Sequence, residues 1–302
     1  MQKITFETKR EQSAFIRAEF DQFAKNLAET APALTSRTWS FELETPDADN
    51  IATALAKHYR LQSAELISIS GENQDPREIL TFCGDGSITR EGDQECTCDC
   101  ASCTYHSCDC EHCDNGNEYP DHDCGYSECA GLGDYQEIKP ATYCEGTHPQ
   151  HLALLDLANI ADVEINDSCG LHVHIGSSDL TARDVANVIR TYRALAHIIE
   201  PIAGRRGEHY CQDNSNSEIL DAQFHQTATD KYRAVNTAPH FATYRPDTIE
   251  FRQHAGTNST AEIRAWAMFM IRIVEFAKTN RTTLWLQEAQ TFAQAWQLLA
   301  TK

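Results

Sequence analysis

The sequence has few positive charges, no long apolar run and no recognisable export signal. Lys and Arg number 25 against 45 Asp and Glu, which gives a formal net charge of −20. Proteins that bind polyanions usually carry a basic face, so we do not expect nucleic acid as a partner. No stretch approaches the ~18 apolar residues of a membrane span, and residues 1–7 lack the basic-then-apolar pattern of a signal peptide. We therefore expect a cytoplasmic protein without a membrane partner.

Residues 91–134 lack Lys and Arg and contain almost no apolar residues. Such a segment cannot form a hydrophobic core, so a bound metal is the expected source of its stability. It holds nine of the 13 cysteines, and Cys-x-x-Cys occurs in it twice, ten residues apart. The nine are Cys96, Cys98, Cys100, Cys103, Cys108, Cys110, Cys113, Cys124 and Cys129.

Paired Cys-x-x-Cys motifs at short spacing are typical of structural Zn²⁺ sites. His106, His112 and His122 are further donors in the same segment. About two ions with four ligands each would use these groups. An iron–sulfur cluster stays open as the alternative, because thiolates alone also suit it. Disulfides are not expected in the cytoplasm. We therefore predict a small zinc-binding insertion at residues 91–134.

Three stretches, at residues 39–44, 170–176 and 248–252, alternate apolar and polar residues. A period of two indicates a β-strand with one polar face. Residues two apart on a strand share a face, so each stretch presents a pair of charged or ligating groups. The pairs are Glu42 with Glu44, His172 with His174, and Glu250 with Arg252. Carboxylates with histidine suit a hard divalent cation, and Arg suits phosphate oxygens. The sequence therefore predicts a sheet whose polar face binds metal and nucleotide phosphates.

These motifs carry a family resemblance. Gly-Leu-His-Val-His at 170–174, after Asn166 and Ser168, resembles the Asn-x-Ser-Gly-Met-His-x-His signature of glutamine synthetases. Phe-Glu-Leu-Glu at 41–44 is similar to the acidic pair on the first strand of that superfamily, and Thr-Ile-Glu-Phe-Arg at 248–252 resembles its Glu-x-Arg strand. The combination most resembles the amidoligase family, a compact branch of the glutamine synthetase and glutamate–cysteine ligase superfamily.

The resemblance implies an α+β fold with a glutamine synthetase-like antiparallel active-site sheet backed by helices. Residues 1–90 and 135–302 would form the catalytic domain, and residues 91–134 the metal-stabilised Cys-rich insertion. The implied activity is an ATP-dependent ligation that joins a carboxylate to an amine through an acyl phosphate. The substrates would be small-molecule or peptide acids and amines. Their identity and the oligomeric state stay open.

The resemblance also implies roles for individual residues. Those that would hold Mg²⁺ are Glu42, Glu44, Glu137, His172 and Glu250. His174 would contact a phosphate of ATP directly. The family has an Arg-x-x-x-Asn-like segment before the Glu-x-Arg strand, and Arg233 and Asn236 resemble it with a spacing one residue shorter. Arg252, Arg233 and Arg245 would neutralise the transferred phosphoryl group, and Asn236 would contact the nucleotide or substrate.

Two other functions stay open. Guanidino kinases share the superfamily's sheet, so phosphoryl transfer without ligation is one alternative. A non-catalytic, zinc-dependent interaction module is the other.

Apolar spacing also predicts the remaining secondary structure. Helices are expected at residues 9–28, 51–59, 148–160, 261–278 and about 283–299, and a further helix should run from a cap within 177–181 to about residue 201. Strands are expected at 64–70, 79–82 and 135–140. Residues 203–230 are predicted to be irregular.

Overall fold

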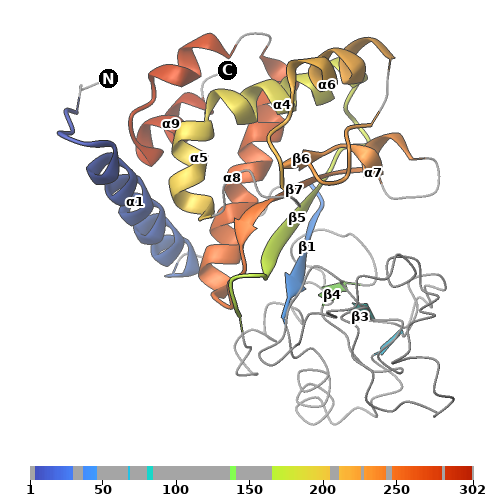
Figure 1. Cartoon of the computed structure of the whole chain (residues 1–302), viewed down its shortest axis with the longest axis horizontal. Helices are drawn as coiled ribbons and strands as arrows, with labels where there is room; N and C mark the ends of the chain where they lie inside the picture. The colour runs from blue at the N-terminus through green and yellow to red at the C-terminus, as the bar shows by residue number, and fades with distance from the viewer. Residues whose placement is uncertain are drawn as a thin grey trace, which may run out of the picture.

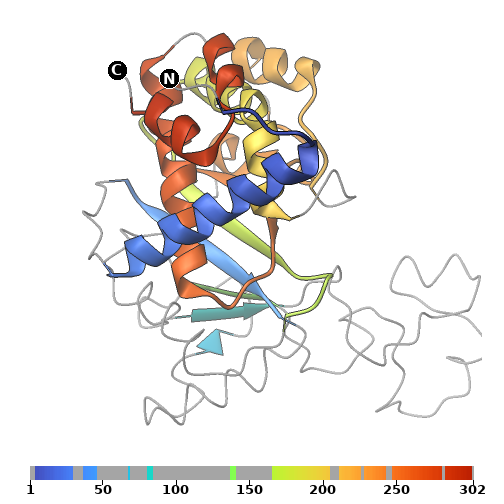
Figure 2. The same cartoon turned by 90° about the vertical axis from the view of Figure 1, so that its left-hand side faces the viewer.

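The computed structural model describes residues 4–29, 37–45, 165–204, 211–225, 228–242, 247–280 and 283–300, with the backbone of three short strands at 67–68, 80–83 and 137–140. These residues form a sheet packed against helices, so the predicted α+β class is confirmed (Figures 1 and 2). The Cys-rich segment 91–134 and the helices predicted at 51–59 and 148–160 lie outside the described residues.

Seven strands form the described sheet, in the order β2-β3-β4-β1-β5-β7-β6. They are β1 Trp39–Glu44, β2 Ile67–Ser68, β3 Leu80–Cys83, β4 Glu137–Pro140, β5 Gly170–Gly176, β6 Val235–Asn236 and β7 Thr248–Ala255. All neighbours pair antiparallel except β2 and β3, which are parallel. The three strands predicted to carry the charged pairs, β1, β5 and β7, are adjacent.

Helices cover the sheet and one another. They are α1 Lys9–Glu29, α4 Ala182–Ala194, α5 Ala196–Ala203, α6 Asn216–Leu220, the π-helix η3 Asp221–His225, α7 Ala238–Phe241, α8 Thr260–Thr279, the 3₁₀ helix η4 Leu284–Glu288 and α9 Phe292–Leu298. Helix α8 packs on β5, and α5 packs on β7. Figure 1 shows α1 beside α8 and α5, on the side of the molecule away from α6. None of the described helices is long and apolar enough to cross a membrane.

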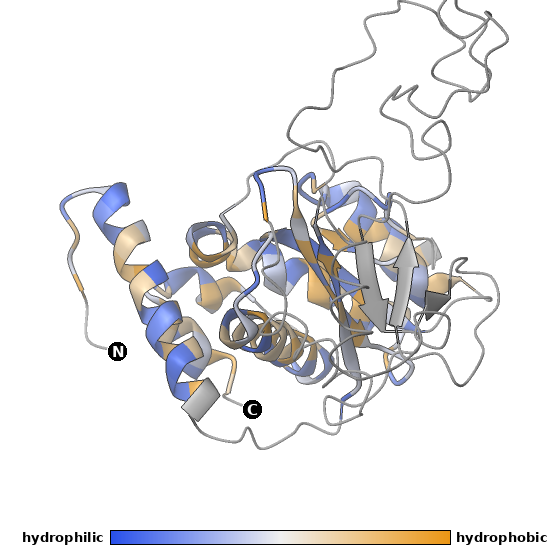
Figure 3. Ribbon diagram, turned by 90° about the horizontal axis from the view of Figure 1, so that it is seen from below, coloured by the Kyte–Doolittle hydropathy of each residue, from blue (hydrophilic) through white to orange (hydrophobic). Residues whose placement is uncertain are grey.

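The apolar face of the strands and the inner faces of the helices form one core. Phe41, Val173 and Phe251, from β1, β5 and β7, are fully buried in it with Trp266 and Phe269 of α8. In Figure 3 the apolar residues concentrate in the central strands and in the helices behind them. Burial of such a side chain contributes about 1.5–3 kcal/mol to stability, so this face of the alternation holds the sheet in place.

Three predictions of secondary structure need correction. The helix predicted to run to about residue 201 is divided into α4 and α5 at Leu195, whose φ of −100° and ψ of 8° leave the helical region. Residues 203–230 are not wholly irregular, because Ser215 caps α6 and accepts a hydrogen bond from the Glu218 amide at 3.2 Å. The last predicted helix is two elements, η4 and α9, and Thr291 provides the new N-cap of α9.

Candidate active site

Six side chains from three adjacent strands, five of them buried and Arg252 half-buried, meet on the polar face of the sheet. We call them the acid–histidine cluster: Glu42, Glu44, His172, His174, Glu250 and Arg252. The register explains the meeting, because Glu42 is paired with His172 across β1 and β5, and His174 with Glu250 across β5 and β7. Cross-strand partners project to the same side of a sheet and lie within reach of each other. The predicted convergence of the three charged pairs is confirmed.

His172 lies between carboxylates on both sides of its ring. Its Nδ1 is 3.1 Å from Oε2 of Glu42 and 3.5 Å from Oε1 of Glu250. Its Nε2 is 3.1 Å from Oε1 of Glu44. Both ring nitrogens therefore face carboxylates, and the negative charge of these groups favours the imidazolium form of His172.

His174 offers its Nε2 to two carboxylates. This atom lies 3.1 Å from Oε1 of Glu42 and 3.9 Å from Oε1 of Glu250. Ligand atoms of these three residues all lie within 4.8 Å of one another. The other ring nitrogen, Nδ1, is 3.3 Å from Oγ1 of Thr248, which is buried on β7. Among the described residues, His174, Glu42 and Glu250 thus form a candidate metal site, and Nδ1 of His172 lies within 3.5 Å of the same two carboxylates.

Glu250 is held at both carboxylate oxygens. Arg252 donates to Oε1 at 2.5 Å, and the amide of Asn236 donates to Oε2 at 2.6 Å. Asn236 is in turn fixed because its Oδ1 accepts a hydrogen bond from the Ala238 amide at 2.9 Å. These contacts orient the carboxylate toward the two histidines and leave it few alternative rotamers.

Electrostatics in the cluster follow from this geometry. Burial lowers the pKa of His172, but Glu44, Glu42 and Glu250 outweigh both burial and the Arg252 charge and raise that pKa to about 9. Burial alone would raise the pKa of Glu250, yet Arg252 and the two histidines lower it. The cluster therefore favours the ionised form of Glu250 although this carboxylate is buried.

The turn before β5 positions Glu44. Asn166 accepts hydrogen bonds at Oδ1 from the Ser168 amide at 2.9 Å and the Ser168 hydroxyl at 2.6 Å, and this closes an Asx turn. The chain then enters β5 at Gly170, whose amide donates to Oε2 of Glu44. Residues 166–170, Asn-x-Ser-x-Gly in this chain, thus have a structural role: they present a backbone donor to the acid.

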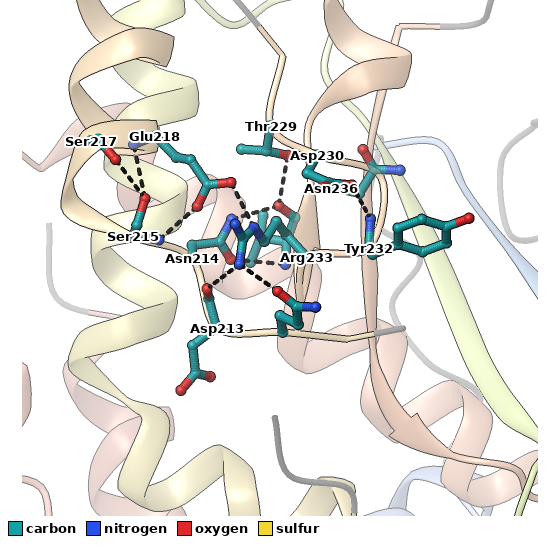
Figure 4. A network of polar contacts seen from close by, with 12 residues as sticks. Asp213, Asn214, Ser215, Ser217, Glu218, Thr229, Asp230, Tyr232, Arg233 and Asn236 are labelled. Atoms are coloured by element: carbon teal, nitrogen blue, oxygen red, sulfur yellow. Dashed lines mark hydrogen bonds and ion pairs between the residues drawn. The ribbon is translucent and has the colours of Figure 1, made fainter. Parts of the chain in front are cut away.

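Arg233 is not brought into the cluster. Figure 4 shows its guanidinium turned to Glu218, with Nε 2.7 Å from Oε1, and Nη1 also donates to Gln212 at 3.0 Å and to the Asp213 carbonyl at 3.2 Å. Glu218 completes the capping box of α6 with Ser215, since its Oε2 accepts from the Ser215 amide at 2.6 Å. In this structure the contacts of Arg233 stabilise the start of α6 and the residues just before it. The phosphate contact predicted for Arg233 stays a prediction.

Other predicted site residues fall wholly or partly outside what is described. Arg245 and the nine cysteines lie outside the described residues. Only the backbone of Glu137 is described, and it is paired in register with Glu44 across β4 and β1. One residue in contact with the cluster was missed by sequence reasoning. Thr248 lies two positions before Glu250, so the alternation that selected Glu250 and Arg252 contained the signal for it as well.

The donors fit a hard divalent cation better than a soft one. Glu42 and Glu250 supply carboxylate oxygens, and His174 supplies one imidazole nitrogen. Carboxylate-rich sets with a single histidine suit Mg²⁺ or Mn²⁺, whereas thiolate sets suit zinc. Three buried carboxylates also face one arginine and the imidazolium of His172, so the cluster keeps negative charge that an added cation would balance.

A comparison with protein families finds a match to the family described as "putative amidoligase enzyme", over residues 151–274. The matched segment contains β5, β6 and β7, and therefore His172, His174, Asn236, Glu250 and Arg252. It does not reach β1, which supplies Glu42 and Glu44. No curated protein matches the chain. No solved structure matches it either. Residues 151–274 are thus similar to the family that the motifs predicted.

Proposed function

We propose that this protein is an ATP-dependent carboxylate–amine ligase that acts through an acyl phosphate, on a sheet of the glutamine synthetase type. The observation that carries the proposal is the acid–histidine cluster, in which β1, β5 and β7 bring three carboxylates, two imidazoles and a guanidinium into mutual contact. The family match supports the general class, a ligase. The nucleotide, the metal and the intermediate are our proposals.

The residues that would hold Mg²⁺ are Glu42, His174 and Glu250, with Glu44, His172 and Glu137 as further predicted ligands. Held there, Mg²⁺ would supply positive charge that offsets the negative charge of the nucleotide phosphates. The protein's part is to orient the carboxylates. Asn236 and Arg252 do this for Glu250, and the Gly170 amide does it for Glu44.

Arg252 is the group best placed to interact with a transferred phosphoryl group. Its side chain is 15% exposed and its pKa is raised: burial opposes the charged form, but Glu250 and Glu42 outweigh it. A guanidinium in such a partly desolvated place interacts more strongly with an anion than it would in water. Loss of one such donor typically costs on the order of 3 kcal/mol of transition-state stabilisation, or a hundredfold or more in rate.

The chemistry needs this arrangement because a carboxylate is a poor electrophile. In the proposed sequence a carboxylate oxygen of the acid attacks the γ-phosphorus of ATP, and the bond to the ADP oxygen breaks. The amine nitrogen then attacks the carbonyl carbon of the acyl phosphate, inorganic phosphate leaves, and the nitrogen loses a proton to a base or water. Catalysis of the first step is mainly positioning and charge stabilisation.

The test is ADP release screened across pools of carboxylic acids and amines, with the products identified by mass spectrometry. The proposal predicts ADP release that depends on Mg²⁺ and on both an acid and an amine. The mass of the new product should equal the mass of the acid plus the mass of the amine minus that of one water molecule. A phosphorylated guanidine instead of an amide would establish the phosphotransferase alternative. Absence of any ATP-dependent product with every pool would contradict both.

A further inference from the structure

Helix α4 carries three arginines on its solvent-facing side: Arg183, Arg190 and Arg193. Arg190 donates to Oδ1 of Asn187 at 2.9 Å and to Oε1 of Gln223, and Arg193 donates to Oδ1 of Asn216 at 2.5 Å. All of these acceptors are neutral amides. Within the described part of the chain, neither Arg190 nor Arg193 forms an ion pair with a carboxylate, although the whole chain has a formal net charge of −20.

A cavity of about 420 Å³ opens beside these arginines, between α4, α6 and the start of η4. We call it the arginine groove. Among the described residues its lining is Arg190, Arg193, Ala194, Asn216, Ile219, Leu220, Thr283 and Gln287, none of which is acidic. Of the described acids nearby, Glu218 is paired with Arg233, Asp221 and Glu288 are exposed and outside the lining, and Asp213 lines a second cavity that it shares with Arg193.

Exposed apolar side chains lie in the lining of this groove or close to it in sequence. Four large apolar side chains are exposed in the described part of the chain, and three of them are Leu220 at 51%, which lines the groove, Phe224 at 66%, on η3 directly after α6, and Leu284 at 76%, next to the lining residue Thr283. Single exposed apolar residues are ordinary, but several near a cavity whose arginines contact only neutral amides are typical of an interaction surface. The amide contacts of Arg190 and Arg193 also hold the two guanidinium groups in place, which reduces the entropy lost on binding.

Charge decides what kind of partner fits. Burial and the nearby charge of Arg183 lower the pKa of Arg190, so this site gains from an incoming anion. A guanidinium binds a carboxylate through two parallel hydrogen bonds, and Arg190 and Arg193 lie three residues apart, on one face of the helix. A small inorganic anion would leave Leu220, Phe224 and Leu284 in water, whereas a peptide with both acidic and apolar side chains would cover them.

We propose that the arginine groove is a docking site for a short acidic peptide segment of a partner protein, with carboxylates bound by Arg190 and Arg193 and apolar side chains placed on Leu220, Phe224 and Leu284. This surface lies on the helical side of the sheet and is separate from the acid–histidine cluster. The proposal therefore does not depend on the ligase activity, and either can fail without the other.

The experiment selects peptides from a random 12-residue displayed library on the immobilised full-length protein and measures the recovered peptides by fluorescence anisotropy. The proposal predicts that recovered sequences are enriched in Asp or Glu together with Leu, Ile or Phe. Their affinity should fall at least tenfold for the double variant R190Q/R193Q, and it should weaken with added salt, as charge-driven contacts do. A matched control is K9Q/R10Q, which removes two exposed positive charges from α1 on the far side of the molecule (Figure 1). That variant should bind as the wild type does.

Two further variants keep the test decisive if R190Q/R193Q folds poorly. L284S changes a side chain that is 76% exposed and should leave thermal unfolding unchanged while weakening the peptides severalfold. R190K/R193K keeps the charge but loses the two-bond geometry, so intermediate affinity is expected. Recovery of peptides without acidic enrichment, or equal binding to wild type, L284S and R190K/R193K, would overturn the proposal.

Discussion

Glu42 and His172 are direct cross-strand partners, and Oε2 of the acid lies 3.1 Å from Nδ1 of the histidine. The other oxygen of the same carboxylate lies 3.1 Å from Nε2 of His174. One side chain of β1 therefore links both histidines of β5. Since His174 is paired in register with Glu250, the hydrogen-bond ladder of the sheet itself assembles the cluster from three separate segments of the chain.

The first prediction concerns the protonation of His172 in metal-free protein. Its pKa is raised from 6.5 to about 9, because three carboxylates outweigh burial. The proton therefore stabilises the fold fully below pH 6.5, and this contribution, on the order of 3 kcal/mol, is lost as pH rises through 9. NMR titration of the imidazole signals, with His172→Gln used for assignment, should give a midpoint near 9. A midpoint near 6.5 would show that the carboxylates do not surround this ring.

The second prediction separates the two arginines. Arg252→Lys keeps the charge beside Glu250 but not the guanidinium, so ATP turnover should fall about a hundredfold while the fold stays intact. Arg233→Ala removes the bond to Glu218, so it should lower the free energy of unfolding by about 1–3 kcal/mol and change turnover little. Turnover assays beside urea unfolding distinguish them. If Arg233→Ala loses turnover as strongly as Arg252→Lys at unchanged stability, Arg233 has the phosphate role that its motif implies.

The third prediction concerns Thr248. When Nε2 of His174 binds a metal, Nδ1 carries the proton and needs an acceptor, and Oγ1 of Thr248 is 3.3 Å away. Partners of this kind typically change metal affinity 10–100-fold. Mn²⁺ titration followed by electron paramagnetic resonance should show such a loss in Thr248→Val, which has nearly the same shape. Thr248→Ser retains the hydroxyl and should bind as the wild type does. Equal Mn²⁺ affinity in all three proteins would remove Thr248 from the site.

The fourth prediction tests the packing at the end of β5. A Cβ added at Gly176 would lie 2.1 Å from Oγ1 of Thr38 and 3.2 Å from the Thr38 carbonyl oxygen. Gly176→Ala should therefore lower the free energy of unfolding by about 1–3 kcal/mol. Adding Thr38→Ala removes the nearer atom and should recover most of that loss in chemical denaturation. No recovery in the double variant would mean that the backbone contact, not the hydroxyl, causes the strain.

Local patterns predicted much of the fold and the polar face. The alternation in β1, β5 and β7 identified which side chains share a face, because each strand has one face in the core and one polar face. Alternation fails at one place. Between Leu171 and Val173 the partner strand passes from His254 to Phe251, which is an irregularity of register. His254 consequently packs on Trp266, with ring centroids 4.8 Å apart, and does not join Arg252 two residues earlier.

Long-range pairing could not be predicted in this way. The placement of Arg233 depends on Glu218, which lies in a segment whose sequence is polar and shows no helical period, so neither α6 nor the ion pair was expected. Similarly, the interatomic distances that join both histidines to Glu42 and Glu250 are not determined by spacing along a strand. The sequence does not specify the acid and the amine, because nothing in the motifs encodes them.

The central claim is that the acid–histidine cluster binds a divalent metal that positions ATP. Its most direct test is isothermal titration of ATP into wild type and Glu250→Gln, each with and without Mg²⁺. The account predicts one site per chain that requires Mg²⁺, with affinity at least tenfold weaker in Glu250→Gln. ATP binding that is absent in wild type, independent of Mg²⁺, or equal in the two proteins would contradict it.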